Sequence, residues 1–298
     1  MDYIQKPKVT IIIPCYNREK YIQKTVNSVL NQTYENFEVI CIDDGCTDNT
    51  RDILNIYSKK IKVIEHLGRL NKGQSASINL GIYNSDSKYI SILDSDDLFA
   101  PSKIEEQVEY LEANPKIGYM YSNGYAIDEN DNLLYPLFPN DYIASGDPET
   151  ILLECPLGTP SGYLIRRNVF KKAGVFNEKL RSAQDHDIAI RISEISEIGY
   201  LNKIHWYKRE HSDSLSSLQA ERRWRSGFLI LKNAGRRYPY SFSTKRRRLA
   251  VLNFRMGQCM LVKNKYYLAV LHFLISGLLD PMRAIKVIIK KENIGGYN

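Results

Sequence analysis

The first hundred residues alternate between two periodicities, and this alternation restricts the fold more than any other feature of the chain. Buried strands are indicated by four short, apolar, β-branched runs, at residues 9–14, 37–42, 61–64 and 89–93. Helical spacing of apolar residues occupies the intervals, at residues 19–32, 48–57 and 73–83. This order predicts an α/β fold, with a mostly parallel sheet flanked by helices on both faces.

The rest of the chain follows a less regular pattern. Pro101 suits the first position of a helix that runs to about residue 113. Further strands are expected at 119–127 and 163–166 and a helix at 187–195, while 128–160 reads as a long polar loop. From about residue 215 the pattern indicates helices only, so we expect a helical C-terminal extension to the α/β domain.

The charge of the chain is divided unevenly. Residues 1–200 contain 21 Lys and Arg against 29 Asp and Glu, whereas residues 201–298 contain 20 against 5. A basic C-terminal region predicts a surface that meets something anionic, either nucleic acid or the negatively charged cytoplasmic leaflet of a membrane. No recognised nucleic-acid-binding fold accompanies the charge, so we expect no nucleic-acid partner.

Cysteine usage and the terminal segment predict a cytoplasmic location. The five cysteines are odd in number and form no Cys-x-x-Cys pair, which is typical of reduced thiols. The N-terminus has no apolar segment of the kind found in signal peptides. The longest apolar stretch, residues 266–279, is too short to span a bilayer as a helix.

Three polar loops follow predicted strands, where parallel sheets bind their ligands. Asp94-Ser95-Asp96-Asp97 could present two carboxylates to Mg²⁺ or Mn²⁺, or could simply cap the next helix. Asp43-Asp44-Gly45 could accept hydrogen bonds from a base or a ribose, with capping again the alternative. Tyr16, in Pro14-Cys15-Tyr16-Asn17, could stack on a nucleobase or pack at the sheet edge.

These segments together resemble family 2 glycosyltransferases, whose fold is called GT-A and binds nucleotide-diphospho-sugars. The resemblance covers residues 8 to about 218. It is carried by residues 9–17, the Asp-Asp-Gly loop, Asn71-Lys-Gly to Asn79, residues 89–97, Pro160 to Phe170, Gly174 to Glu178, Gln184 to Arg191, and Tyr207 to Ser216. The resemblance implies an inverting transferase of the bacterial cell-surface polysaccharide type.

The resemblance also implies roles for individual residues. Asp185 would be the catalytic base, Asp96 and His211 would bind the metal, and Mn²⁺ or Mg²⁺ would be the cofactor. The nucleotide would be bound by Pro14, Tyr16, Asp43, Asp44, Lys72 and Asp94. The acceptor would be bound by Ser161, Gly162 and Gln184. Cys46 stands where the family usually has serine, which leaves that contact to the nucleotide in doubt.

The base is needed because an acceptor hydroxyl must lose its proton as it attacks the anomeric carbon. By resemblance, the donor is a nucleotide sugar, a UDP-sugar first of all, and the acceptor is a saccharide or lipid-linked saccharide. Two alternatives stay open: a protein that binds a nucleotide sugar without turnover, and a sugar nucleotidyltransferase. The latter lacks support because the glycine-rich, arginine-containing N-terminal loop of such enzymes is absent.

We expect a catalytic domain at 1–214, with a nucleotide-sugar-binding half at 1–100 and an acceptor-binding half at 101–214. Residues 215–298 would form a basic helical region. Basic residues beside apolar helical faces predict peripheral contact with an anionic membrane, at the inner face of the plasma membrane. The alternative is that these helices only pack on the catalytic domain with a solvated basic face.

Overall fold

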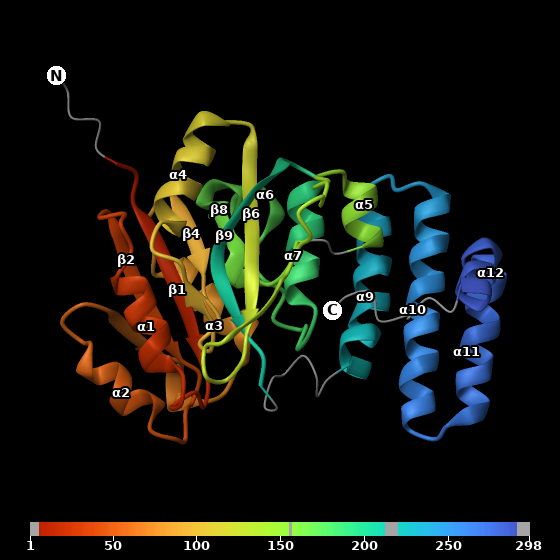
Figure 1. Cartoon of the computed structure of the whole chain (residues 1–298), viewed down its shortest axis with the longest axis horizontal. Coiled ribbons are helices and arrows are strands. Elements are labelled where there is room, and N and C mark those ends of the chain that lie inside the picture. Colours follow the sequence, from red (N-terminus) through yellow and green to blue (C-terminus); the bar gives the residue numbers. More distant parts are fainter. Residues whose placement is uncertain (1–5, 155–156, 212–219, 291–298) are drawn as a thin grey trace. The chain divides into compact units, whose positions relative to one another are not determined.

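The chain forms two compact units in a computed structural model that describes residues 6–154, 157–211 and 220–290 (Figure 1). The first unit comprises residues 1–146 and 156–211, and the second comprises 147–155 and 212–298. Three features of the sequence analysis lie outside the described residues: the predicted boundary at residue 214, residues 212–216 of the segment Tyr207 to Ser216, and Cys155. The four described cysteines are free thiols, as predicted.

The first unit is built on one nine-stranded sheet, whose main path runs in the order β3-β2-β1-β4-β8-β6-β9-β5. Its first half consists of β1 (Val9–Cys15), β2 (Phe37–Asp43), β3 (Lys62–Glu65) and β4 (Tyr89–Ile92). These four strands are all parallel, with β1 between β2 and β4. Every residue of β1 and β4 is buried, which explains their unbroken apolar runs.

The second half of the sheet is mixed. It consists of β5 (Leu98–Phe99), β6 (Ile117–Ile127), β7 (Leu133–Pro136), β8 (Tyr163–Arg166) and β9 (Glu197–Arg209). The strand β8 runs antiparallel to both β4 and β6, while β9 runs parallel to β6 and antiparallel to β5. The C-terminal end of β9 is thereby carried next to the loop that follows β4.

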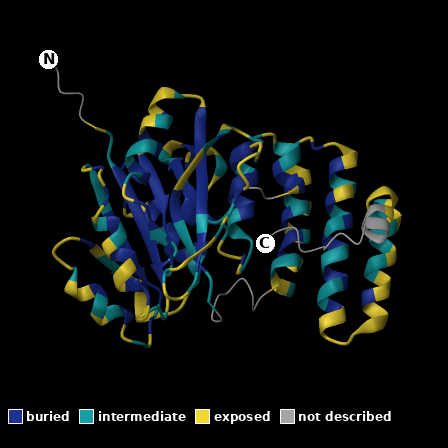
Figure 2. Cartoon of the chain, viewed as in Figure 1, coloured by how far each residue is buried: buried dark blue, intermediate teal, exposed yellow. Residues whose placement is uncertain are grey.

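Helices flank this sheet, as the sequence predicts. They are α1 (Ile22–Leu30), α2 (Thr50–Ile56), α3 (Gln74–Tyr83), α4 (Lys103–Ala113), α6 (Phe170–Ala173) and α7 (Gln184–Ser193). Single 3₁₀ turns occur at η1 (Leu67–Arg69), η2 (Pro160–Gly162) and η3 (Arg167–Val169). Burial is concentrated in the strands and on the helix faces that meet them (Figure 2).

The second unit consists of helices. They are α5 (Pro148–Leu153), α9 (Ala220–Arg237), α10 (Phe242–Val262), α11 (Tyr266–Leu279) and α12 (Pro281–Lys290). Asp280 accepts a hydrogen bond from the Arg283 amide at 3.3 Å and caps α12. Within the described part of the chain, no helix combines the length and the hydrophobicity needed to cross a membrane.

The predicted fold class is confirmed, but the reading of 128–160 as one long loop is wrong. That segment contains both β7 and α5. The strand β7 pairs with β6, and α5 belongs to the helical unit, where Arg248 donates to the Leu153 carbonyl at 3.0 Å. These short elements are stabilised by distant partners, so the local sequence pattern does not reveal them.

Gly81 allows α3 to pack closely on β1. A Cβ atom at Gly81 would lie 2.6 Å from Cγ2 of the fully buried Ile12. We predict that Gly81→Ala lowers the free energy of unfolding by about 1 to 3 kcal/mol, because the core must shift. Gly235 is exposed on α9 with nothing nearer than 3.5 Å, so Gly235→Ala should instead stabilise by about 0.5 to 1 kcal/mol.

Urea denaturation followed by circular dichroism measures both changes. Equal effects of the two substitutions would contradict the close packing of α3 on β1, because helix propensity alone favours alanine at both positions.

Candidate functional site

Three loops meet at the carboxyl edge of the parallel strands. They follow β1, β2 and β4, the positions expected for a ligand site in such a sheet. Asn17 joins the first two loops, because its side-chain oxygen accepts from the Thr47 amide at 2.8 Å. Asn17 has a φ of 50°, a left-handed conformation that asparagine tolerates better than most residues. Tyr16, beside it, is 44% exposed.

The two acids after β2 differ in what their oxygens contact. Asp44 accepts from the backbone amides of Lys72 and Gly73, at 2.7 and 2.9 Å, and so holds the loop that precedes α3. Burial raises the pKa of Asp44 above its ordinary value despite these amides. Asp43 accepts from the Cys46 amide through Oδ1, but its buried Oδ2 has no hydrogen-bond partner among the described residues. Two arginine side chains lie 3.7 Å from this oxygen and balance its charge without donating a hydrogen bond to it. An acceptor that lacks a hydrogen bond suits a ligand donor.

A chain of two glutamines connects α7 to the loop after β4. Gln184 Nε2 donates to Gln74 Oε1 at 2.5 Å, and Gln74 Nε2 donates to Asp94 Oδ1 at 2.6 Å. Burial raises the pKa of Asp94 well above its ordinary value, and the charges of neighbouring acids, Asp185 among them, raise it further. The predicted base is therefore within electrostatic reach of the loop after β4.

Asp185 lies in the first turn of α7, and Ala183 occupies the N-cap position. Ala183 has a left-handed backbone with φ of 61°, which is unusual for alanine and is typical of segments held in place by their surroundings. Asp187 pairs with Arg191 at 2.7 Å one turn further along α7. The charge of Asp187 is thus balanced within its own helix.

Asp96 lies between two basic side chains. Its Oδ2 lies 2.9 Å from Arg18 Nε and 3.1 Å from His211 Nε2. Burial alone would raise the pKa of Asp96, but the His211 hydrogen bond and the Arg18 charge outweigh it and lower the pKa. His211 is held in turn by Tyr21, whose ring centroid lies 5.0 Å from its own. Asp96 therefore carries its negative charge at neutral pH.

Asp97 has a structural role. Its Oδ2 accepts from the Ser161 hydroxyl at 2.6 Å and its Oδ1 from the Arg209 amide at 2.9 Å. Burial and the charge of Asp96 raise the pKa of Asp97 to about 7. The same serine hydroxyl accepts from the Asp94 amide at 3.1 Å. Ser161 thus holds two acids of the loop in place.

Gly162 is small for a structural reason. A Cβ atom there would lie 2.8 Å from Nε1 of the Trp206 indole. Both Ser161 and Gly162 are buried, so neither presents a side chain at the surface where an acceptor would approach. Any influence on an acceptor would pass through the loop they support.

The side chains at this edge fit a divalent cation only if a bound substrate supplies the remaining atoms of the cation's coordination shell. Among the residues that the structure describes, no group of three or more His, Cys, Asp or Glu could hold a metal ion. Asp96 Oδ2 and His211 Nε2, however, lie 3.1 Å apart, and two ligands at right angles around Mg²⁺ or Mn²⁺ are separated by about 3 Å. Two protein ligands plus substrate phosphates are the usual arrangement for such ions.

Most of the predicted residues gather at this edge of the sheet. Some of the predicted residues make side-chain contacts at this edge, namely Asp43, Asp94, Asp96, Gln184 and His211. The Lys72 side chain is exposed, and this residue contributes its backbone. Sequence reasoning missed Arg18, Gln74 and Arg209. Arg18 directly follows the Pro-x-Tyr-Asn motif, whereas Gln74 and Arg209 carry no local signal.

Arg209 organises the loop after β4 from inside the protein. Its guanidinium group is fully buried, donates to the Asp96 carbonyl at 2.9 Å and the Asp128 carbonyl at 3.0 Å, and pairs with Asp131 at 2.5 Å. It also lies over the Tyr21 ring, 5.0 Å from the centroid. One cation thus connects the end of β9, the loop after β4 and the turn after β6.

Known proteins are similar to this chain in sequence and in fold. A profile described as Glycosyl transferase family 2 matches residues 10–174. An uncharacterized glycosyltransferase of Rickettsia bellii is 35% identical over 200 residues, which are 67% of this chain and 28% of that protein. The chain spans about a third or less of the length of the first curated relatives it matches.

Two solved structures share the fold. One is Staphylococcus aureus TarS 1–349 in complex with UDP-GlcNAc, with a TM-score of 0.68 and 18% identity over 97% of this chain and 89% of that one. The other is the mannosyltransferase PcManGT of Pyrobaculum calidifontis in complex with GDP-Man and Mn²⁺. Its TM-score is 0.64, with 15% identity over the same shares of the two chains.

Asp131 provides a matched test of the buried cation, because it pairs with both Arg209 and Lys24. The Lys24 side chain is 54% exposed, while that of Arg209 is fully buried. We predict that Arg209→Met lowers the free energy of unfolding by about 3 to 5 kcal/mol, because it leaves buried acceptors unpaired. Lys24→Met should cost at most about 1 kcal/mol.

Chemical denaturation of the two variants measures this difference. If the two substitutions cost the same, Arg209 does not organise the loop in the way its contacts indicate.

Proposed function

Because this chain belongs to glycosyl transferase family 2, we propose that it moves a sugar from a nucleotide-diphosphate donor to a hydroxyl group of a saccharide or lipid-linked saccharide. The preferred donor in this proposal is a UDP-sugar. The observation that carries the proposal is the hydrogen-bonded path from Gln184, which directly precedes Asp185 at the start of α7, through Gln74 to Asp94 in the loop after β4. A base and a donor-binding loop must lie side by side for a single displacement.

The catalytic domain in this proposal is residues 1–214, with the donor bound by 1–100 and the acceptor by 101–214. Tyr16 stacks on the base, and Oδ2 of Asp43, which accepts no hydrogen bond from the described residues, accepts one from the base or the ribose. Pro14 and Lys72 border this site, and Asp44 acts through the Lys72–Gly73 backbone. The UDP-GlcNAc complex of a protein with the same fold supports UDP as the nucleotide.

The reaction proceeds with inversion in one step. Asp185 takes the proton of the acceptor hydroxyl as its oxygen attacks the anomeric carbon. The bond from that carbon to the diphosphate oxygen breaks at the same time, and the electron pair leaves with the nucleoside diphosphate. Attack opposite the leaving group inverts the anomeric configuration. Asp94, held by Gln74, orients the donor for this attack.

A divalent cation bound between Asp96 and His211 would neutralise charge on the leaving diphosphate. The low pKa of Asp96 keeps this carboxylate ionised for that purpose. Arg18 adds a fixed positive charge at the same oxygen. The Mn²⁺ in a mannosyltransferase with the same fold supports manganese or magnesium as the ion.

The acceptor enters beside α7. Gln184 has a buried Oε1 without a hydrogen-bond partner among the described residues, which suits an acceptor hydroxyl. Ser161 and Gly162 shape the acceptor floor indirectly, through the loop that they support. We place the reaction in cell-surface polysaccharide assembly, in the cytoplasm and at the inner face of the plasma membrane, where lipid-linked acceptors are found.

The nucleotide site can be tested by thermal shift. We predict that one of UDP, GDP, dTDP and CMP stabilises the protein with Mn²⁺ but not with EDTA. A ligand at 100 times its dissociation constant should add about 2.7 kcal/mol. Asp96→Asn should abolish the manganese dependence. Asp86→Asn is the control, because the Asp86 side chain is 85% exposed and pairs with Lys8 away from the three loops.

A shift with UTP and sugar phosphate, accompanied by release of pyrophosphate, would favour a sugar nucleotidyltransferase instead. A manganese-dependent shift without any turnover would favour a binding protein.

The base can be tested with two neighbouring acids. We predict that Asp185→Asn lowers kcat by about 10²- to 10⁴-fold while leaving the nucleotide shift unchanged. Asp187→Asn should leave kcat within about twofold per folded molecule, because Asp187 is already paired with Arg191. Release of nucleoside diphosphate from the donor measures both rates. Full activity in Asp185→Asn would exclude this residue as the base.

A further inference from the structure

The helix α11 has two faces with different surroundings. One face packs on α10: Ala269 is fully buried, His272 Nδ1 lies 3.0 Å from Asn253 Oδ1, and Ser276 donates to the Ala250 carbonyl at 2.8 Å. Gly257 makes the close approach possible, since a Cβ there would lie 2.6 Å from the Phe273 ring. The position of α11 on α10 is therefore well determined by specific contacts.

The opposite face of α11 is apolar and exposed. It contains Tyr267, Val270, Leu271, Leu274 and Leu278, with Tyr267 82% and Leu278 84% exposed. Nearby exposed side chains extend it, namely Val262 at the end of α10 and Met282 and Ile285 on α12. No charged residue occurs within the 14 residues of α11. Exposed apolar patches of this extent mark a binding surface.

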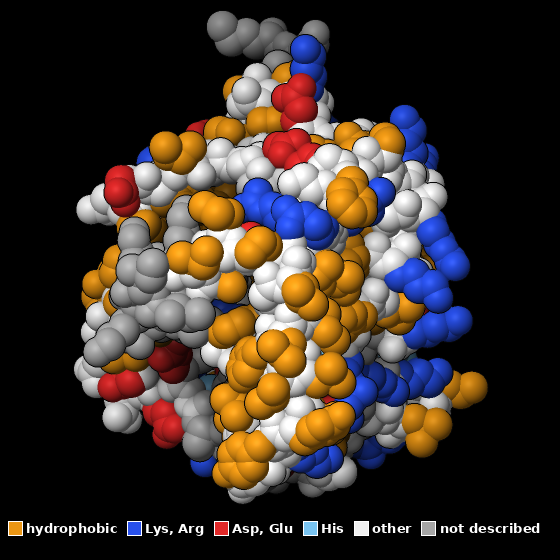
Figure 3. All heavy atoms as spheres, turned by 90° about the vertical axis from the view of Figure 1, so that its right-hand side faces the viewer, with side chains coloured by type: hydrophobic (Ala, Val, Ile, Leu, Met, Phe, Trp, Pro, Cys, Tyr) orange, Lys and Arg blue, Asp and Glu red, His pale blue; other side chains and the backbone are white. Residues whose placement is uncertain are grey.

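Cations border this surface. Lys265 directly precedes α11 and Arg283 follows it, and both side chains are exposed. Between residues 242 and 285, eight Lys and Arg accompany a single acid, Asp280, which is mostly buried near Arg247. Figure 3 shows the hydrophobic side chains in one field, with Lys and Arg side chains above it and to its right.

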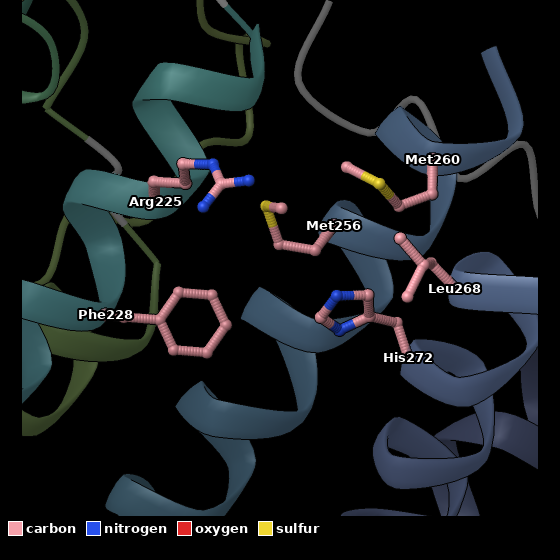
Figure 4. A pocket seen from close by; sticks show the side chains of 6 residues that line it. All are labelled: Arg225, Phe228, Met256, Met260, Leu268 and His272. Carbon is pink, nitrogen blue, oxygen red and sulfur yellow. The ribbon is translucent and has the colours of Figure 1, made fainter. Parts of the chain in front are cut away.

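A hollow of about 370 Å³ lies on the other side of α11, between it, α9 and α10 (Figure 4). It is lined by Arg225, Phe228, Met256, Met260, Leu268 and His272. Arg225 is already paired with Glu221 at 2.7 Å. The hollow therefore offers no uncompensated cation for an anionic ligand, and the exposed face carries the inference.

We propose that the exposed face of α11, together with Lys265 and Arg283 at its two ends, binds an anionic lipid bilayer. A 14-residue helix is about 21 Å long, too short to span the hydrocarbon core of about 30 Å, so it lies in the plane of the interface. The Tyr266 and Tyr267 rings beside Lys265 match the depth at which aromatic and basic side chains reach lipid headgroups.

Charge favours lipid over a second copy of the chain. Two copies joined by this face would form a symmetric interface. Whichever way the two helices run, each of the two cations, Lys265 and Arg283, would lie opposite a cation of the other copy. An anionic headgroup layer instead complements both cations. The inference concerns a surface of the helical unit and does not depend on the catalytic roles proposed for the first unit.

Vesicle flotation of the full chain tests the proposal, with phosphatidylcholine vesicles that contain or lack phosphatidylglycerol. We expect binding to the anionic vesicles only. Lys265→Gln with Arg283→Gln should weaken that binding by roughly thirtyfold, which is about fivefold for each charge removed. Leu274→Glu with Leu278→Glu should weaken it by about tenfold or more.

Ile56→Glu is the matched control, because Ile56 is 75% exposed on α2 but has no place in this surface. It should float with the anionic vesicles as the unchanged protein does. Melting curves by circular dichroism verify that each variant is folded. If Leu274→Glu with Leu278→Glu does not fold, Leu274→Ser with Leu278→Ser takes its place.

Three results would overturn the proposal. The first is equal binding to neutral and anionic vesicles, and the second is binding that survives both double substitutions. The third is sedimentation as a dimer that Leu274→Glu with Leu278→Glu dissociates, without any vesicle binding, because the face would then join two copies. Since the assay contains no nucleotide or acceptor, none of these results bears on sugar transfer.

Discussion

The first unit depends on how the negative charges of the acids that follow β4 are balanced. Asp94, Asp96 and Asp97 come within four residues of one another at the end of a fully buried strand. Such a concentration of buried negative charge is unstable unless hydrogen bonds and cations offset it. Arg18, near the start of the unit, and His211 and the Arg209 amide, at its end, supply that offset, so the folded loop depends on segments from both ends of the unit.

The surroundings shift the pKa values of the three acids in different directions. Asp96 has a lowered pKa because of His211 and Arg18, whereas burial raises the pKa values of Asp94 and Asp97. The Asp96 carboxylate, with its basic neighbours, is the member of the three that is suited to a cation that arrives with its ligand. The glutamine chain from Gln184 through Gln74 then joins this loop to α7, which explains how a donor site and a base could act on one another.

The helical unit satisfies a different condition. Its helix α11 is attached by specific contacts on one side and presents an apolar side to the surroundings, with cations only at its ends. Helices of a globular core place their apolar stripe inward. In α11 the apolar side faces outward instead, in the part of the chain where Lys and Arg outnumber Asp and Glu.

The sequence by itself determined the strands 9–14, 37–42 and 89–93 and the place of the acidic loops, because burial on both faces of a parallel sheet leaves an unbroken apolar run with polar residues at its end. Tertiary structure alone decided that 128–160 contains β7 and α5, and that Arg209 and Gln74 serve the loop after β4. Periodicity reflects contacts between near neighbours in the chain. Charge compensation and short elements depend instead on which distant segments meet, and only the complete fold brings those together.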